Sequence, residues 1–195
     1  MPLNKKETEP DQGLFVLLLG PSGVGKSTVI KELAQQLDIT YITPVMDRPL
    51  RSGETEKVFT SPEDFTQREQ LGEFIAVNHL YGFRYGTPRA LIEQILANHG
   101  VAILDFPLAK LNLLSDYRQR GALLTIYLLP PSNEELAQRL AKDDRDPDGI
   151  RLAEGLEEIK KLQDANLDHP DVDFFIINYD IHATARQIKQ LILSD

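Results

Sequence analysis

The sequence contains no cysteine and no tryptophan among its 195 residues. The missing cysteines exclude a disulfide framework, thiol catalysis and cysteine zinc sites. Cations are scarce as well, with 21 basic against 30 acidic residues and a net charge of -9. This balance argues against nucleic-acid polymers as partners, because binding them requires a phosphate-neutralising surface. A small anionic ligand needs only a local cluster of cations.

Long hydrophobic runs are also missing. The first apolar run, Leu14–Leu19, is too short for the hydrophobic region of a secretion signal or for a membrane span. Residues 1–12 are charged and polar and include two prolines, which predicts a disordered leader. We therefore expect a cytoplasmic protein without a membrane partner.

Short apolar runs typical of strands buried on both faces recur along the chain. They are Leu14–Leu19, Val101–Phe106, Leu123–Leu129 and Val172–Ile177. Helical periodicity begins at Lys26 and recurs over about Pro88–Asn98, Pro107–Arg120, Ser132–Lys142, Leu152–Leu167 and Ile181–Leu193. This alternation predicts an α/β fold with a parallel sheet flanked by helices.

Two segments interrupt the alternation. Residues from about 43 to 87 are rich in glycine, threonine, aromatic and charged residues, which we interpret as an inserted subdomain. The polar stretch Lys142–Arg151 contains Pro147 and Gly149 and predicts a mobile loop between two helices. The chain length favours one domain over residues 13–195.

The clearest motif lies directly after the first apolar run. Residues 20–27, GPSGVGKS, match G-x-x-x-x-G-K-[ST] at every defined position. The glycines let backbone N–H groups surround phosphates, Lys26 reaches the β- and γ-phosphates, and Ser27 places a hydroxyl on Mg²⁺. An ordinary glycine-rich turn would not explain the buried strand before it and the amphipathic helix after it. We predict a nucleoside triphosphate site at Gly20, Pro21, Ser22, Gly23, Val24, Gly25, Lys26, Ser27 and Thr28.

An ordered set of motifs around this loop resembles the guanylate kinases. The motifs are GPSGVGKST at 20–28, RPLRSGE at 48–54, SPEDF at 61–65, GEFI at 72–75, YGT at 85–87, LLPPS at 128–132 and LAEGLEE at 152–158. The resemblance covers the chain from Gly13 to its end. It implies a P-loop kinase fold with an acceptor-binding subdomain at about 43–87 and a short lid at about 139–151. It also implies Mg²⁺-dependent transfer of the γ-phosphate of ATP to a nucleoside monophosphate, GMP or dGMP.

The acceptor phosphate has several candidate partners. Arg48 and Arg51 stand three residues apart, so that both guanidinium groups can converge on one phosphate or can both be solvated. The resemblance implies that they clamp the acceptor phosphate together with Tyr85, although a buried core tyrosine would fit the sequence equally well. Lys57 stands where the family carries a tyrosine, and it still offers a donor to a phosphate.

Metal and lid residues follow in the second half of the chain. Asp105 ends a buried strand at the edge where open α/β sheets place their ligands. The resemblance implies that Asp105 holds Mg²⁺ near the acceptor together with Ser27. The alternative is that Asp105 only caps a helix that begins at Pro107. Arg139, Arg145 and Arg151 match lid arginines: Arg139 would contact ATP, and the other two would act in catalysis with Lys26 and Arg48. A solvated charge run explains Arg139 equally well.

The resemblance fails at the positions that recognise the base. The four family positions that contact guanine align with Val45, Ala76, Thr87 and Pro107, of which only threonine is polar. Losing two carboxylates costs about 3–6 kcal/mol of discrimination. Asn78 and His79 are candidate replacements. The acceptor base therefore stays open, and two alternatives remain: a kinase for a sugar phosphate or similar metabolite, and a non-catalytic binding module on the same fold.

Overall fold

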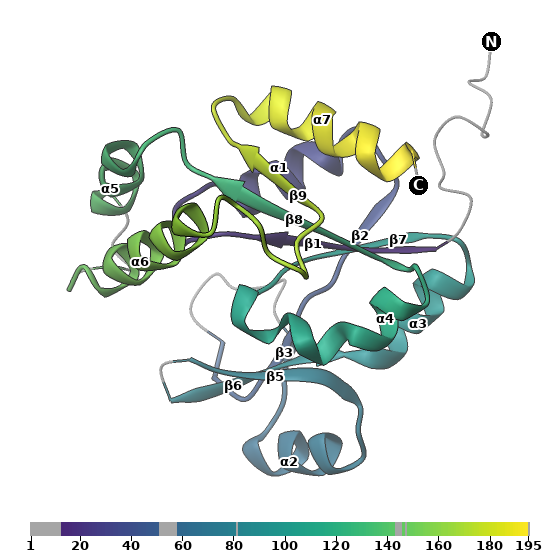
Figure 1. Ribbon diagram of the computed structural model, residues 1–195. Coiled ribbons are helices and arrows are strands. Elements are labelled where there is room, and N and C mark those ends of the chain that lie inside the picture. The colour runs from purple at the N-terminus through teal and green to yellow at the C-terminus, as the bar shows by residue number, and fades with distance from the viewer. Residues whose placement is uncertain (1–12, 51–57, 81, 143–145, 147, 195) are drawn as a thin grey trace.

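A central sheet of five parallel strands forms the middle of the computed structural model, which describes residues 13–50, 58–80, 82–142, 146 and 148–194 (Figure 1). The strand order is β2-β7-β1-β8-β9, and each neighbouring pair is parallel. In that order the strands are Ile39–Tyr41, Val101–Asp105, Leu14–Leu19, Leu123–Leu129 and Phe174–Ile177. This arrangement confirms the expected α/β fold. The expected leader lies outside the described residues.

Helices cover both faces of the central sheet (Figure 1). One face carries α1 (Lys26–Leu33) and α7 (Ile181–Ser194). The other face carries α3 (Arg89–Ala97), α4 (Ser115–Gln119), α5 (Asn133–Ala141) and α6 (Ile150–Asp164). Alternate residues of β1 pack into the two cores, with Val16 on the α1 side and Leu17 on the α3 side. Because helices cover both faces of the sheet, all six residues of β1 are buried, and all six are apolar.

A second sheet lies beyond the central one and is backed by α2, Pro62–Gln70 (Figure 1). Its order is β4-β3-β6-β5, formed by Val58–Phe59, Val45–Met46, Phe83–Pro88 and Phe74–Leu80. Phe65 of α2 packs with Val45 and Phe74 beneath this sheet. The described strands fall within or beside the segment that the sequence singled out at about 43–87, and its role in acceptor binding stays a prediction.

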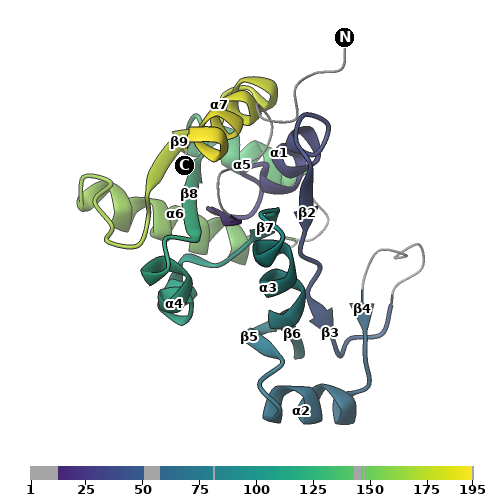
Figure 2. The same cartoon turned by 90° about the vertical axis from the view of Figure 1, so that its right-hand side faces the viewer.

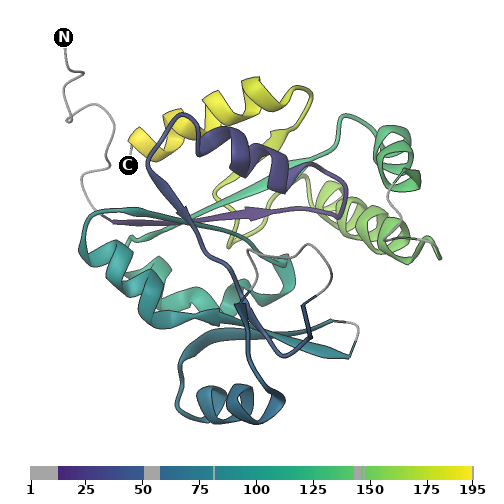
Figure 3. The same cartoon turned by 180° about the vertical axis from the view of Figure 1, so that it is seen from behind.

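Two connections join the second sheet to the carboxyl edge of the central sheet. The chain leaves β2 at Tyr41 and enters β3 at Val45, as Figures 2 and 3 show from two sides. It leaves β7 at Asp105 and forms a 3₁₀ helix, Leu108–Leu114, whose Lys110 Nζ donates to the carbonyl oxygen of Val77 in β5 at 2.6 Å. The second sheet is therefore attached at the edge where the P-loop lies.

The helix expected over about Pro107–Arg120 is in fact two elements. A 3₁₀ helix covers Leu108–Leu114, and only Ser115–Gln119 is α-helical. The buried leucines Leu111 and Leu114 stand three residues apart, which matches the three-residue turn of a 3₁₀ helix. Among the described residues, no helix is both long and apolar enough to cross a membrane.

A polar cluster joins α4 to the start of β9. Arg118 Nη1 donates to Asp173 Oδ1 at 2.8 Å, and the backbone N–H of Thr125 donates to Asp173 Oδ2 at 2.7 Å. Burial raises the pKa of Asp173, but the hydrogen bonds from Arg118 and Thr125 outweigh burial and hold the pKa below its usual value. Because the pKa of Asp173 is lower in the folded state than in the unfolded state, its ionisation stabilises the fold at pH values above the unfolded-state pKa. This stabilisation is lost as the pH falls through the folded-state pKa.

We therefore expect Asp173→Asn to lower the free energy of unfolding at neutral pH by about 1–3 kcal/mol, since a charged acceptor of several hydrogen bonds is lost. The difference should begin to shrink below about pH 4, the usual pKa of an aspartate in an unfolded chain, and should disappear as the pH falls through the lower folded-state pKa of Asp173. Urea unfolding at pH 7 and pH 3 measures both values, with the exposed Asp164→Asn as control. If Asp173→Asn lowered the free energy of unfolding equally at both pH values, the stabilising role of the ionised Asp173 carboxylate would be contradicted.

Candidate active site

The P-loop connects the carboxyl end of β1 to the first turn of α1. Gly25 is the N-cap residue of α1 and adopts a φ of 104°, a left-handed conformation that favours glycine. A Cβ at this position would lie 2.7 Å from Asn178 Nδ2, so a larger residue is excluded on steric grounds too. The sequence thus places the N-terminus of α1, with its unpaired N–H groups, at the end of a rigid strand.

Lys26 lies over this loop. Its Nζ donates to the carbonyl oxygens of Gly20 at 2.7 Å and Pro21 at 3.0 Å. Burial lowers the pKa of Lys26, while the carboxylates of Asp105 and Glu158 act in the opposite direction. The ammonium group is therefore held in a partly desolvated setting, where its attraction to an anion is stronger than in bulk water.

A polar pocket of about 380 Å³ opens beside the ammonium group. Besides the loop residues Ser22, Gly23 and Gly25, its lining residues are Lys26, Ser27, Thr28, Asp105 and Arg151. They come from the P-loop, the end of β7 and the first turn of α6. The structure thus brings together the predicted triphosphate residues, the predicted metal ligand and one predicted lid arginine.

Asp105 is held by a tyrosine that the sequence analysis did not select. The hydroxyl of Tyr41, at the end of β2, donates to Asp105 Oδ1 at 2.8 Å. Burial raises the pKa of Tyr41 and the Asp105 carboxylate raises it further, so the hydroxyl stays protonated and remains a donor. Pro107 opens the 3₁₀ helix with no side-chain cap hydrogen bond, so the structure does not support the alternative that Asp105 acts as a cap.

We expect Tyr41→Phe to lower kcat about threefold to tenfold and to raise the Mg²⁺ concentration needed for half-maximal rate, because one hydrogen bond that orients Asp105 is lost. The melting temperature should change little, since Tyr41 is 38% exposed. A Mg²⁺ titration at saturating nucleotide measures the effect, and Tyr179→Phe, at a tyrosine 70% exposed, is the control. Equal Mg²⁺ requirements in all three proteins would contradict this role.

A second residue missed by the sequence analysis fixes the backbone of the P-loop. Asn178, directly after β9, donates through Nδ2 to the carbonyl oxygen of Val24 at 2.8 Å and accepts at Oδ1 from Thr184. Arg139 of α5 contacts the same carbonyl oxygen at 3.3 Å and pairs with Glu135. Arg139 is thus adjacent to the loop, as its expected role at ATP requires, and is not part of a purely solvated charge run.

α6 approaches the P-loop closely at Gly155. A Cβ added there would lie 2.7 Å from Pro21 Cβ, so only glycine permits this contact. The backbone N–H of Arg151 donates to Asp146 Oδ1 at 3.0 Å, which fixes the first turn of the helix. Arg151 is thereby positioned at the pocket. Arg145, expected to act with it, lies outside the described residues.

Two of the residues expected to clamp the acceptor phosphate meet at the second sheet. Arg48 is 8% exposed, and its Nε donates to the hydroxyl of Tyr85 at 3.3 Å. The structure therefore brings together two of the four residues predicted to hold the acceptor phosphate. The other two, Arg51 and Lys57, lie outside the described residues.

The four positions aligned with guanine recognition do not share one surface in the structure. Val45 packs with Phe65 and Phe74 on the α2 side of the second sheet. Ala76 and Thr87 are cross-strand neighbours, and both are buried. Pro107 is exposed and begins the 3₁₀ helix. Thr87 is the polar group that these positions retain.

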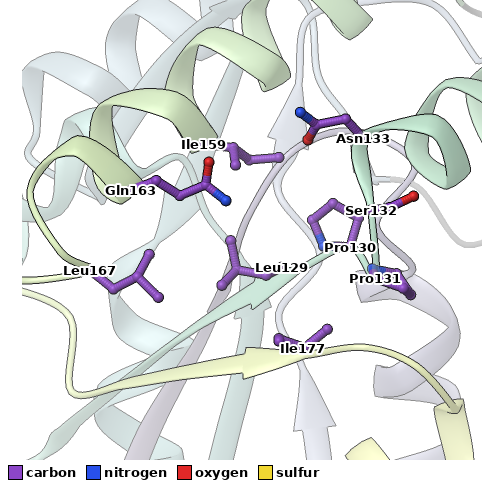
Figure 4. A pocket seen from close by; sticks show the side chains of 9 residues that line it. All are labelled: Leu129, Pro130, Pro131, Ser132, Asn133, Ile159, Gln163, Leu167 and Ile177. Carbon is purple, nitrogen blue, oxygen red and sulfur yellow. The ribbon is translucent and has the colours of Figure 1, made fainter.

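A second hollow lies on the α6 side of β8 and β9, as Figure 4 shows. It measures about 300 Å³, and its apolar lining residues include Leu129, Ile159, Leu167 and Ile177. Its lining includes no charged residue, so it offers no counter-charge for a phosphate. The polar pocket at Lys26 is the one suited to a nucleotide triphosphate.

The donor set in the polar pocket is suited to Mg²⁺. Ser27 and Asp105 offer one hydroxyl and one carboxylate, both oxygen donors, and the described residues include no cluster of three acidic or histidine ligands. Magnesium prefers oxygen ligands and commonly shares its coordination between one or two protein groups, substrate phosphates and water. These two residues therefore fit a metal that enters with a nucleotide.

A parallel sheet, a P-loop with its lysine and serine, and an arginine-bearing second sheet at the same edge define a P-loop phosphotransferase. The guanylate kinase family model matches residues 12–195, and the chain belongs to this family.

Individual relatives agree with this assignment. The guanylate kinase of Symbiobacterium thermophilum is 31% identical over 191 residues, covering 94% of this chain and 86% of that protein. The guanylate kinase of Clostridioides difficile is also 31% identical, with 94% and 89% covered. The crystal structure of guanylate kinase from Anaplasma phagocytophilum superposes with a TM-score of 0.71 at 26% identity, covering 96% and 88% of the two chains.

Family membership confirms the expected activity class. The protein is an enzyme, a nucleoside monophosphate kinase that uses ATP as phosphate donor and Mg²⁺ as cofactor. The two alternatives, a sugar-phosphate kinase and a non-catalytic binding module, are not favoured by these relatives.

Proposed function

We propose that the enzyme transfers the γ-phosphate of ATP to GMP, with the residue roles set out below. The observation that carries the proposal is the polar pocket in which Lys26, Ser27, Asp105 and Arg151 meet at the P-loop. At the second sheet, attached to the same edge, the buried Arg48 just after β3 contacts the half-buried Tyr85 of β6. The pocket at Lys26 and the Arg48–Tyr85 pair are the two candidate phosphate-binding groups.

On the donor side, the backbone N–H groups of residues 20–25 and the α1 N-terminus would surround the phosphates of ATP. Lys26 would neutralise charge on the β- and γ-phosphates. Ser27 and Asp105 would hold Mg²⁺, which when bound neutralises the phosphate oxygens of the nucleotide. Tyr41 keeps the Asp105 carboxylate oriented toward this pocket.

On the acceptor side, Arg48 and Tyr85 would bind the phosphate of GMP, assisted by Arg51 and Lys57. A guanidinium group forms strong charge-assisted hydrogen bonds with phosphate oxygens. Arg48 is already fixed by its contacts with Tyr85 and with the carbonyl oxygen of Pro49, at 2.8 Å, so little side-chain freedom is lost on binding.

Arginines from α5 and α6 would complete the site. Arg151 lines the pocket, and Arg139 contacts the P-loop at Val24. With Arg145 they would stabilise charge that spreads over the transferring phosphoryl group. Transfer between phosphates depends on positioning and charge neutralisation, so the scheme assigns no general base.

The direct test is an ADP-release assay with ATP, Mg²⁺ and each of GMP, dGMP, AMP, CMP and UMP. We expect GMP and dGMP to give the highest kcat/KM. Turnover with none of the five monophosphates would contradict the proposal, and a preference for a pyrimidine would contradict its acceptor.

We also propose that the enzyme acts in the cytoplasm on free nucleotides, without a nucleic-acid polymer as partner. The net charge of -9 supports this, because an acidic surface repels polyanions while the cationic pocket attracts small ones.

A further inference from the structure

The β5–β6 hairpin presents four side chains on one face. Ala76 pairs with Thr87, and Asn78 pairs with Tyr85, in the antiparallel register. Residues directly opposite one another share a face, and so do residues two apart on a strand. Because Tyr85 contacts Arg48, this is the face of the phosphate clamp, and Asn78 lies beside the clamp.

The opposite face of the hairpin is an apolar core. A Cβ at Gly86 would lie 2.6 Å from the ring of Phe74, and Val45 and Val77 pack in the same cluster. Val45 therefore cannot contact an acceptor base while this packing holds. His79 is exposed and alternates with Asn78 along the strand, so it is removed from the clamp as well.

Asn78 carries an unused acceptor on the clamp face. Its Oδ1 is buried and has no hydrogen-bond partner among the described residues. Buried polar atoms are normally paired, because an unpaired one costs stability. The strand is held in place next to it by the bond from Lys110 to the Val77 carbonyl oxygen. A fixed, buried and unpaired amide oxygen is suited to receive a donor from a ligand.

We propose that Asn78 reads the base of the acceptor nucleotide, with Oδ1 accepting from the N1–H group of a 6-oxopurine and Nδ2 donating to its O6 atom. This inference rests on the proposed function of the site. An amide both donates and accepts, so it can engage these two neighbouring groups, whereas a carboxylate only accepts. Guanine and hypoxanthine share this edge. Position 76 is alanine and therefore supplies no carboxylate for the 2-amino group.

The consequence is a specific pattern of acceptors. IMP, which lacks the 2-amino group, should be phosphorylated with a kcat/KM within about tenfold of that for GMP, because no charged acceptor reads that group. AMP should be slower than both, because its ring N1 carries no hydrogen for Oδ1. Thr87, buried and directly across from Ala76, lies on the same face of the hairpin.

The test compares kcat/KM for GMP, IMP and AMP in the wild type, Asn78→Ala, Asn78→Asp and the control His79→Ala. We expect Asn78→Ala to lower kcat/KM for GMP and IMP about tenfold, mainly through KM, with the KM for ATP unchanged. His79→Ala should stay within about twofold of the wild type for all three. Asn78→Asp, which is isosteric, should raise KM for IMP and GMP by altering the O6 contact while thermal stability is kept.

Three results would overturn the inference. One is an equal effect of Asn78→Ala and His79→Ala, another is an equal loss for GMP and AMP, and the third is Asn78→Asp kinetics identical to the wild type. If the wild type did not phosphorylate GMP at all, the proposed function would fail, and this outcome is distinguishable. GMP-induced shifts in melting temperature, compared between the wild type and Asn78→Ala without ATP, would then still decide whether Asn78 binds the base.

Discussion

Lys26→Met is expected to lower kcat about 10³-fold, because it removes the one P-loop side chain positioned to neutralise the phosphate oxygens during transfer. The methionine keeps much of the apolar stem, and the two hydrogen bonds lost are those to the carbonyl oxygens of Gly20 and Pro21. Since burial lowers the pKa of Lys26, the wild-type site already holds this cation in an unfavourable setting, which the anionic ligand relieves.

The matched control is Lys31→Met, which removes an exposed lysine from the same helix. Its kcat should stay within about twofold of the wild type. Steady-state ADP release at saturating ATP and GMP gives both values, and circular dichroism verifies folding. A folded Lys26→Met enzyme with more than a tenth of wild-type kcat would contradict the role given to this residue.

Arg48→Met should raise the KM for GMP about 100-fold or more, with a smaller change in the KM for ATP. Two charge-assisted hydrogen bonds to one phosphate are each worth about 1.5–3 kcal/mol, and both are lost with the guanidinium group. Arg48 is 8% exposed, and methionine keeps an unbranched stem at this position while removing the charge. Tyr85→Phe removes one hydroxyl only and should raise the same KM about tenfold.

Arg68→Met provides the control for charge, because Arg68 belongs to α2 in the same part of the chain and pairs with Glu73 on its surface. Its KM for GMP should be unchanged. Initial rates across GMP concentrations at saturating ATP measure all four proteins. If Arg48→Met and Arg68→Met gave equal KM values, the phosphate clamp would have to lie elsewhere.

The buried strands of the central sheet were predictable because each is a continuous apolar run bounded by polar or turn residues. Leu14–Leu19 and Leu123–Leu129 have the same ends in sequence and structure. β2 was not predicted, since it has three residues, of which Thr40 and Tyr41 are exposed. A strand this short and polar carries no periodic signal, and only its pairing with β7 defines it.

The P-loop was predictable for a different reason: its parts are contiguous in sequence, so spacing alone identifies them. The contacts that fix it are not contiguous. Asn178 and Val24 are 154 residues apart, and Tyr41 and Asp105 are 64 apart. Such pairs depend on the pairing of β9 with β8 and of β2 with β7 in the central sheet, which no local pattern encodes.

The residues proposed to contact the acceptor base could not be selected from the sequence alone either. The apolar residues at Val45, Ala76 and Pro107 were visible in the sequence, and they raised the question of how a base is recognised. The sequence could not separate Asn78 from His79 as replacements. The hairpin register does so, because it sets Asn78 opposite Tyr85 and leaves His79 on the other face.

The central claim is direct transfer of a phosphoryl group from ATP to a nucleoside monophosphate in the pocket at Lys26. The most direct measurement uses ATP radiolabelled in its γ-phosphate together with GMP and Mg²⁺, followed by separation of the products. Our account predicts that the label appears in GDP, with one ADP formed for each GDP. Label released as inorganic phosphate, or retained in ATP while GMP stays unchanged, would contradict it.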